Sequence, residues 1–187
     1  MDAPDTYINP SDSRAYWSDV SADVNGMLGG FPLVSRVDLI GSRAFLAKNG
    51  VGAKEPLRKV KRVMEGGAGI GRITEGLLTS IAETVDVVEP IPKFTAQLAS
   101  KPGVGLVQNV GLEEWRPPQP KDGEEKVVYD VIWNQWCLGH LTDDQLVEYL
   151  LRCKEVLEPE MGFIVVKENM STMGGDVFDD EDSSVTR

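Results

Sequence analysis

The sequence has little of what several classes of protein need. It holds one histidine and two cysteines, Cys137 and Cys153, too few for a disulfide framework or a convincing zinc site. No run approaches the roughly twenty apolar residues of a membrane helix, and the polar start, Met1–Asp5, has no signal-peptide pattern. We therefore expect an intracellular protein without a metal or a membrane partner, located in the cytoplasm. Lys59–Arg62 fits a strand better than a nuclear signal, which leaves the nucleus open as a second location.

Basic residues are scarce relative to acidic ones. The chain has 19 Lys and Arg against 30 Asp and Glu, for a net charge of −11. Nucleic acid is therefore disfavoured as a main partner, because phosphate binding needs clustered Lys and Arg. An acidic surface suits a cationic substrate, although acidity also serves solubility alone. The 187 residues, 41% of them hydrophobic, suffice for one domain with its own core.

Glycine, by contrast, is concentrated at one place where the chain changes from strand to helix. Residues 63–74 read Val-Met-Glu-Gly-Gly-Ala-Gly-Ile-Gly-Arg-Ile-Thr, with four glycines in the six positions from Gly66 to Gly71. Only glycine lets the backbone approach a ligand this closely, or adopt positive φ without a steric penalty. A helix that begins just after such a turn directs its free N–H groups and its dipole at a bound group.

The spacing of the glycines restricts the class of ligand that the turn can bind. A dinucleotide fingerprint counted from Gly67 would place Arg72 at its third glycine, and the Gly-Lys-Ser/Thr of a P-loop is absent. The remaining pattern, acid-x-Gly-x-Gly-x-Gly from Glu65, resembles motif I of the S-adenosylmethionine-dependent methyltransferases. Glu89, at the end of the next expected strand, would hold the ribose hydroxyls of that cofactor. The alternative is that the glycine turn is only a tight connection.

Strand and helix patterns alternate from residue 59 onward. This alternation predicts an α/β fold, a doubly wound and mostly parallel sheet with helices on both faces. Five strands are expected, at 59–64, 84–89, 104–108, 127–133 and 162–167. Helices are expected at 71–82, 91–100 and 143–157, the last of which begins with a capping box.

The N-terminal part has a different character. Residues 1–13 are polar with two prolines and predict a disordered lead. A helix capped by Ser35 should end at Asn49–Gly50. Between them, the glycine-flanked apolar segment Asn25–Phe31 fits either core contacts or a loop that folds over a bound ligand. We divide the chain into an N-terminal tail with a helical cap or lid, 1–57, and a main domain, 58–187.

Polar and aromatic residues follow the expected strands, at the edge where parallel sheets bind ligands. Residues 111–115, 133–140 and 168–170 are the segments concerned. The lone histidine, His140, fits either a structural or a catalytic role. The four consecutive acids at 179–182 fit either a solvated tail or part of a site.

The chain after about residue 14 resembles one family, the protein α-N-terminal methyltransferases that act on Xaa-Pro-Lys or Xaa-Pro-Arg termini. The motifs that carry the resemblance are Tyr16-Trp17, Gly26–Gly30, Gly67–Arg72, Trp133–Trp136, Gly139–Asp143, Lys167–Met170 and Asp179–Val185. The resemblance implies a class I S-adenosylmethionine methyltransferase fold with S-adenosyl-L-methionine as cofactor and protein N-termini as partners. It also makes 58–187 a methyltransferase domain and the acidic stretch part of the active site.

The resemblance further implies roles for individual residues. Arg72 would bind the methionine carboxylate of the cofactor. The cofactor set as a whole is Glu65, Gly67, Gly69, Arg72, Glu89, Pro90, Ile91, Leu112, Glu113 and Gln135. The substrate set is Trp17, Leu28, Trp136, Asn169, Asp179 and Ser184. His140 and Asp182 would serve the reacting amine.

These residue types suit the reaction. An α-amine has a pKa of about 7.7–8.0 and is mostly protonated near neutral pH, so a base must take its proton or hold the free amine in line with the methyl group. Asp182 can accept the proton, and His140 can accept it or pass it on. Trp136 offers a flat wall to proline, and Asp179 suits the Lys or Arg side chain of the substrate.

The sequence departs from the family pattern in two ways. Glu65 and Glu89 stand where family members usually have Asp, which lengthens each acidic arm by one methylene. The family fold also continues beyond Arg187 with a last helix and two strands, so a C-terminal truncation is expected. Two other functions therefore stay open: a cofactor-binding chain with weak or no catalysis, and a methyltransferase for a small cationic amine.

Overall fold

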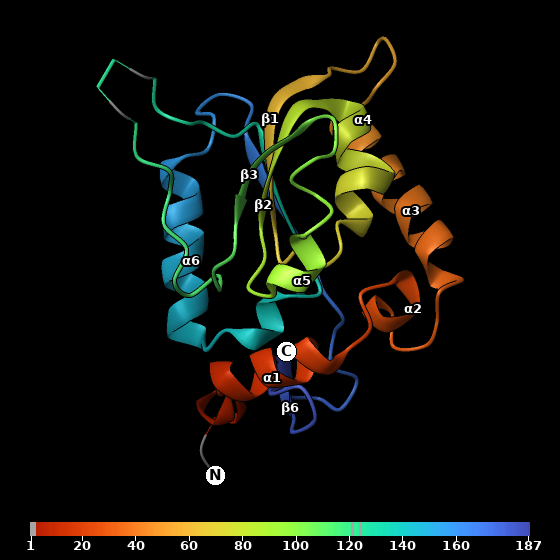
Figure 1. Ribbon diagram of the computed structural model, residues 1–187, viewed down its shortest axis with the longest axis vertical. Helices are drawn as coiled ribbons and strands as arrows, with labels where there is room; N and C mark the ends of the chain where they lie inside the picture. The colour runs from red at the N-terminus through yellow and green to blue at the C-terminus, as the bar shows by residue number, and fades with distance from the viewer. Residues whose placement is uncertain (1–2, 121, 124) are drawn as a thin grey trace.

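The computed structural model describes residues 3–120, 122–123 and 125–187, and its centre is a five-stranded parallel sheet (Figure 1). The strands are β1 (Val60–Gly66), β2 (Ala82–Val88), β3 (Val104–Gln108), β4 (Val131–Gln135) and β5 (Phe163–Lys167). Their order is β3-β2-β1-β4-β5, so the winding reverses between β1 and β4. The predicted doubly wound parallel sheet is confirmed, and the reversal marks the place where such sheets bind ligands.

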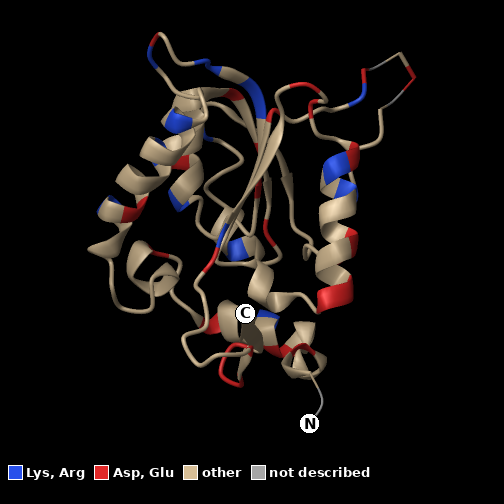
Figure 2. Ribbon diagram, turned by 180° about the vertical axis from the view of Figure 1, so that it is seen from behind, with Lys and Arg blue, Asp and Glu red and all other residues tan. Residues whose placement is uncertain are grey.

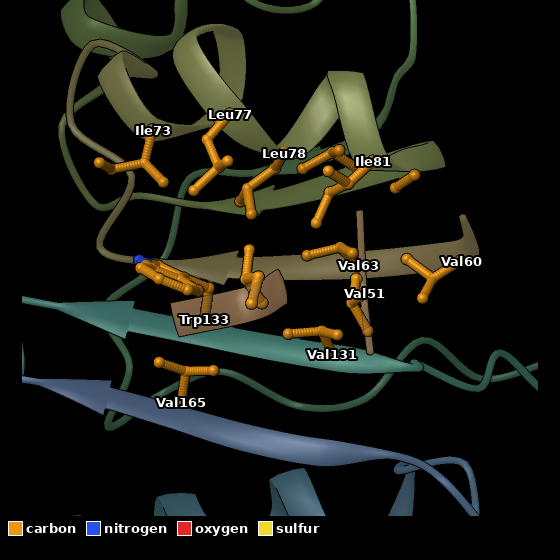
Figure 3. Close-up of a cluster of buried hydrophobic side chains, with 13 residues drawn as sticks. Val51, Val60, Val63, Ile73, Leu77, Leu78, Ile81, Val131, Trp133 and Val165 are labelled. Atoms are coloured by element: carbon orange, nitrogen blue, oxygen red, sulfur yellow. The ribbon is translucent and has the colours of Figure 1, made fainter. Parts of the chain in front are cut away.

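Both faces of the sheet are buried. Neighbouring residues of a strand point to opposite faces, so consecutive residues of β1 enter two different clusters. On one face, Val63 of β1 and Trp133 of β4 pack with Leu77 in a single hydrophobic cluster (Figure 3). On the other face, Met64 packs in a second cluster that contains Tyr149. All five residues of β4 are buried, as expected for a central strand covered on both faces, and its two amides, Asn134 and Gln135, are hydrogen-bonded within the protein.

Helices cover both faces of this sheet (Figure 1). One face carries α3 (Val34–Lys48) beside the π-helical turn η2 (Thr74–Leu78), which continues into α4 (Thr79–Ile81). The other face carries α6 (Asp143–Glu155), and its predicted capping box is confirmed by hydrogen bonds in both directions between Thr142 and Gln145. None of the described helices is long and apolar enough to cross a membrane.

The helix expected at 91–100 is shorter in the structure. Only α5 (Pro92–Thr95) is helical. Beyond it the chain forms turns, in which Leu98 N donates to Thr95 O and Lys101 N donates to Leu98 O. This departure has a packing reason, because Leu98 is fully buried against Gly71 of the glycine turn.

The strand expected at 127–133 is shifted to 131–135. Asp130 explains where it begins, because its Oδ2 accepts hydrogen bonds from Lys61 N and Arg62 N, each at 3.0 Å. The side chain thereby occupies two N–H groups near the start of β1, while Asp130 N still donates to Arg62 O at 2.9 Å. The pairing of β4 with β1 begins at the next residue, where Val131 lies opposite Val63.

The N-terminal segment is folded, so the prediction of a disordered lead is wrong for residues 3–13. η1 (Pro4–Tyr7) is followed by α1 (Pro10–Asp19) and α2 (Val24–Met27). Asn9 caps α1, and its backbone N–H donates to the hydroxyl of Ser183 at 2.8 Å. Such a partner, distant in the sequence, supplies the order that the local composition does not predict.

The acidic stretch near residue 180 is the turn of a β-hairpin, β6 (Val177–Asp179) with β7 (Ser184–Thr186). The alternative of a tail is therefore wrong, although Asp179, Asp180 and Glu181 are exposed to solvent. Arg187 fastens the hairpin, with its Nη2 donating to Asp143 Oδ1 at 2.8 Å and to Leu141 O at 2.6 Å. Figure 1 shows α1 beside β6 at the carboxyl edge of the sheet.

Candidate active site

A pocket lies at the carboxyl ends of β1, β2 and β4, and residues of α1 and α2 also line it. Most residues predicted for the site line this one pocket: Trp17, Glu65, Gly67, Gly69, Arg72, Glu89, Pro90, Ile91, Leu112, Glu113, Gln135, Trp136 and His140. The structure thus brings together the whole predicted cofactor set, although the role of each residue stays a prediction.

The remaining predicted residues lie outside the pocket lining: Leu28, Asn169, Asp179, Asp182 and Ser184. Asn169 and Asp179 are exposed. Leu28 caps the end of α2, and its neighbour Met27 contributes to the pocket instead. Asp182 lies next to the pocket, because its Oδ2 is 4.0 Å from Nε2 of the lining residue His140.

Sequence reasoning missed several lining residues, among them Ser13, Arg14, Met27, Phe94, Cys137 and Leu141. The glycine-flanked segment that contains Met27 carried a signal, since a ligand-covering loop was one of its two interpretations. Ser13 and Arg14 carried none. Arg14 forms an ion pair with Glu113, and this contact joins α1 to the wall expected to face the adenine.

The turn after β1 requires its glycines. Gly67 has φ of 64° and Gly69 has φ of 54°. Residues with a side chain rarely adopt positive φ, whereas glycine does so without a steric penalty. A Cβ at Gly67 would lie 2.3 Å from the Cβ of Cys137, and a Cβ at Gly69 would lie 2.8 Å from the sulfur of Met27. The turn therefore presents bare backbone to the pocket, as a close-fitting ligand needs.

Glu89 is tied to this turn. Its Oε2 accepts a hydrogen bond from Gly69 N and its Oε1 accepts one from Ile91 N, each at 2.8 Å. Burial raises the pKa of Glu89, and the two backbone N–H groups act against that rise. A carboxylate oxygen has more than one lone pair, so each oxygen can still accept a hydrogen bond from a ribose hydroxyl.

Glu65 lies on the floor of the pocket and is almost completely buried. Burial raises its pKa to about 8, and the donating hydroxyl of Thr74 offsets this only in part. The carboxyl group therefore carries a proton at neutral pH.

We expect Glu65→Gln to reduce the pH dependence of stability. A carboxyl group with a raised folded-state pKa binds an extra proton in the folded protein. Its stabilising contribution is therefore complete below pH 4.5 and is lost as the pH rises toward about 8. Glutamine is neutral throughout, so at pH 8 the variant should gain about 4 kcal/mol over the wild type, or about 8–16 °C in Tm.

Thermal unfolding at pH 5 and pH 8 measures this effect. Glu83→Gln is the matched control, because Glu83 is an exposed acid on β2 and its replacement removes the same charge. An equal change of Tm with pH in the wild type and in Glu65→Gln would contradict the burial of a protonated carboxyl group.

Arg72 faces the methionine side of the predicted cofactor site. Its Nη1 donates to Asp38 Oδ2 at 2.6 Å, and its guanidinium lies 5.3 Å from the centre of the Trp136 ring. Trp136 adopts φ of 55°, which is uncommon for a residue with a side chain and is found at functional sites. Gln135 Nε2 also donates to Asp38, at 2.9 Å.

His140 is neutral in a defined tautomer. The indole N–H of Trp17 can only donate, and it lies 3.2 Å from His140 Nε2, which must therefore be the acceptor. The proton is then on Nδ1, which donates to the hydroxyl of Ser13 at 3.0 Å. Burial lowers the pKa of His140, against the raising effect of the Asp182 charge.

Asp182 provides a free acceptor beside this histidine. Its Oδ1 is buried, and no donor reaches it from the described residues. The next residue, Ser183, has φ of 56° and accepts the hydrogen bond from Asn9. The hairpin turn therefore holds a buried carboxylate oxygen ready for a donor that the described part of the chain does not supply.

These features define a class I S-adenosylmethionine-dependent methyltransferase: a five-stranded doubly wound sheet, a glycine turn after β1 and an acid at the end of β2. The family model described as AdoMet-dependent proline di-methyltransferase matches residues 5–187. The chain therefore belongs to this family.

Individual relatives agree with that assignment. The chain is 45% identical over 185 residues to alpha N-terminal protein methyltransferase 1 of Schizosaccharomyces pombe, covering 95% of this chain and 78% of that protein. It is 43% identical to N-terminal Xaa-Pro-Lys N-methyltransferase 1 of Danio rerio, with 95% and 77% covered. A Leishmania major methyltransferase structure matches with TM-score 0.79 and 36% identity, over 95% of this chain and 67% of that one.

The pocket fits S-adenosylmethionine, the cofactor of this family. The bare backbone at Gly67 and Gly69 allows a close approach, and Glu89 offers acceptors to the ribose. Arg72 offers a cation to the methionine carboxylate, and Leu112 provides an apolar surface for the adenine. No group of three or more His, Cys, Asp or Glu among the described residues is arranged to hold a metal ion.

Proposed function

We propose that this chain transfers methyl groups from S-adenosylmethionine to the α-amine of protein N-termini that begin Xaa-Pro-Lys or Xaa-Pro-Arg. The relatives named above are N-terminal protein methyltransferases, some with Xaa-Pro-Lys in their names. The observation that carries the proposal is the buried, unpartnered Oδ1 of Asp182 next to neutral His140. Such an acceptor suits an amine that must be held while it reacts.

The two candidate bases differ in availability. His140 is neutral, but its Nε2 lone pair already accepts from Trp17. Asp182 has an oxygen that accepts from no described donor, and its charge attracts a protonated amine. We therefore assign the first contact with the amine to Asp182. His140 takes a proton through Nε2 only after the indole of Trp17 moves away.

The remaining contacts select the substrate. The sulfonium methyl of the cofactor is already electrophilic, so alignment of the amine supplies much of the acceleration. Trp136 lines the pocket, and its aromatic side chain suits contact with the proline ring. Acidic residues gather near the hairpin (Figure 2), and in our proposal Asp179 of β6 attracts the Lys or Arg side chain of the substrate.

The two other functions have less support. A small-amine methyltransferase would not need the folded acidic hairpin beside the pocket, and no relative named above is one. A chain that only binds cofactor would not need a buried free carboxylate at its mouth. We also propose a cytoplasmic location, with the nucleus as the alternative, and proteins instead of nucleic acid as partners of a chain with net charge −11.

The test uses the 187-residue chain and a synthetic Ser-Pro-Lys-Arg peptide. Calorimetry with S-adenosylhomocysteine first establishes cofactor binding, and mass spectrometry then follows methylation by S-adenosylmethionine. We expect mass gains of whole methyl groups confined to the α-amine. An N-acetylated peptide and a Ser-Ala-Lys-Arg peptide are the controls, and neither should be methylated. Cofactor binding without methylation of Ser-Pro-Lys-Arg would overturn the proposed activity and leave the cofactor site intact.

A further inference from the structure

Asp38 connects three elements at the edge of the cofactor pocket. It lies in the second turn of α3, and its side chain is only 3% exposed. Arg72 Nη1 donates to its Oδ2 at 2.6 Å, and Gln135 Nε2 donates to its Oδ1 at 2.9 Å. Lys167, at the end of β5, forms an ion pair with the same Oδ1. The start of the first helix after β1, the end of β4 and the end of β5 therefore meet at one carboxylate.

The geometry makes Asp38 an indirect participant in the site. Arg72 and Gln135 both line the pocket, whereas Asp38 does not. Asp38 is the one acceptor that the described residues give to the Arg72 guanidinium, whose other nitrogens are not fully buried. Those nitrogens are left for a carboxylate in the pocket, and they face it only while Asp38 and the ring of Trp136 fix the plane of the guanidinium.

Charge alone would argue against an acid at this position. Arg72 and Lys167 together carry two positive charges, and Asp38 neutralises one of them. Burial would raise the pKa of Asp38, but hydrogen bonds from Lys167, Arg72 and Gln135 lower it overall, so the group is ionised at neutral pH. A purely electrostatic view thus predicts that removing the charge of Asp38 strengthens the binding of an anion.

We propose that Asp38 is a positioning residue for the methionine end of the cofactor. It orients the guanidinium of Arg72 and the amide of Gln135 toward the methionine carboxylate, and it couples α3 to the cofactor site. The gain from orienting Arg72 outweighs the cost of neutralising one positive charge near the methionine carboxylate, because a bidentate guanidinium–carboxylate pair depends on alignment. The proposal rests on the cofactor site and is independent of which amine is methylated.

Two ligands separate orientation from general stability. S-adenosylhomocysteine has the methionine-derived carboxylate, whereas 5′-methylthioadenosine keeps the adenine, ribose and thioether without it. Calorimetry of the full chain should show that Asp38→Asn lowers the affinity for S-adenosylhomocysteine by about tenfold or more. This corresponds to the loss of one hydrogen bond to a charged group. The affinity for 5′-methylthioadenosine should stay within about twofold, because that ligand does not use Arg72.

Asp86→Asn is the matched control. Asp86 is buried and accepts hydrogen bonds from Arg62 and Tyr129 at distances of 2.8 to 3.1 Å, but it does not line the pocket. We expect it to lower Tm while the ratio of the two affinities stays as in the wild type. If Asp38→Asn does not fold, Asp38→Glu is the second variant, because it keeps the charge but displaces the carboxylate by a methylene. It should lower the affinity for S-adenosylhomocysteine more than the affinity for 5′-methylthioadenosine.

Two results would overturn the proposal. Unchanged or tighter binding of S-adenosylhomocysteine by Asp38→Asn would show that charge dominates orientation. An equal loss of affinity for both ligands would show that Asp38 only maintains the fold. Failure of the wild type to bind S-adenosylhomocysteine would instead refute the cofactor site on which the proposal rests.

Discussion

Asp182→Asn is expected to lower kcat for methylation of an Xaa-Pro-Lys peptide by about 100- to 1,000-fold. Asparagine keeps the shape of the side chain but loses the negative charge and much of the basicity of Asp182 Oδ1, the buried acceptor that no donor among the described residues reaches. The amine would then stay protonated and poorly held. Affinity for S-adenosylhomocysteine should not change, because Asp182 does not line the cofactor pocket.

The pH profile adds a second readout. The free amine becomes more abundant as the pH rises through its pKa of about 7.7–8.0, so the deficit of Asp182→Asn should shrink in that direction. Asp180→Asn is the matched control, since Asp180 is an exposed acid in the same turn and its loss changes the net charge equally. Wild-type activity in Asp182→Asn would remove Asp182 from the mechanism.

Glu89→Ala should weaken the binding of S-adenosylhomocysteine by about 100-fold, the equivalent of two hydrogen bonds to a charged group. The carboxylate of Glu89 holds the backbone N–H groups of Gly69 and Ile91, each at 2.8 Å, and offers acceptors to the ribose. Alanine removes both functions, so the glycine turn loses its anchor and the ribose loses its partner. Calorimetry measures the change directly.

The same pair of ligands distinguishes Glu89 from Asp38. Adenine and ribose are present in both S-adenosylhomocysteine and 5′-methylthioadenosine, so Glu89→Ala should lower the affinities for both ligands by similar factors. Glu89→Gln keeps the length of the side chain and one acceptor oxygen, and it should lose less affinity than Glu89→Ala. Unchanged affinity in Glu89→Ala would assign the ribose to another group.

Local features of the sequence were enough to predict the sheet. Apolar runs alternating with helical patterns indicated five parallel strands, and the structure contains them in a doubly wound order. The glycine turn was equally clear, because positive φ at Gly67 and Gly69 admits few other residues. The capping box at Thr142 was also predictable, since both of its hydrogen bonds lie within one turn of helix.

The boundaries of some elements depended on distant partners. The strand expected at 127–133 begins four residues later because Asp130 accepts from backbone N–H groups of β1. The helix expected at 91–100 stops at Thr95, and Leu98 packs against Gly71. Neither contact leaves a trace in the periodicity of the segment itself, because side-chain packing overrides local propensity.

The amine side of the site depended on the tertiary structure most strongly. Asn9 and Ser183 are 174 positions apart, yet their hydrogen bond helps to fold both the N-terminal segment and the acidic hairpin. Ser13 and Asp38 carried no signal in the sequence, and each acquires its place through contacts with residues more than 30 positions away.

The parallel sheet, the glycine turn and the acid that follows β2 could be predicted without a structure, because backbone geometry and hydrophobic period are local properties. The tautomer of His140, the free oxygen of Asp182 and the contact of Arg72 with Asp38 became visible in the folded chain alone. These depend on which side chains long-range packing brings within hydrogen-bonding distance, and local patterns do not encode such distances.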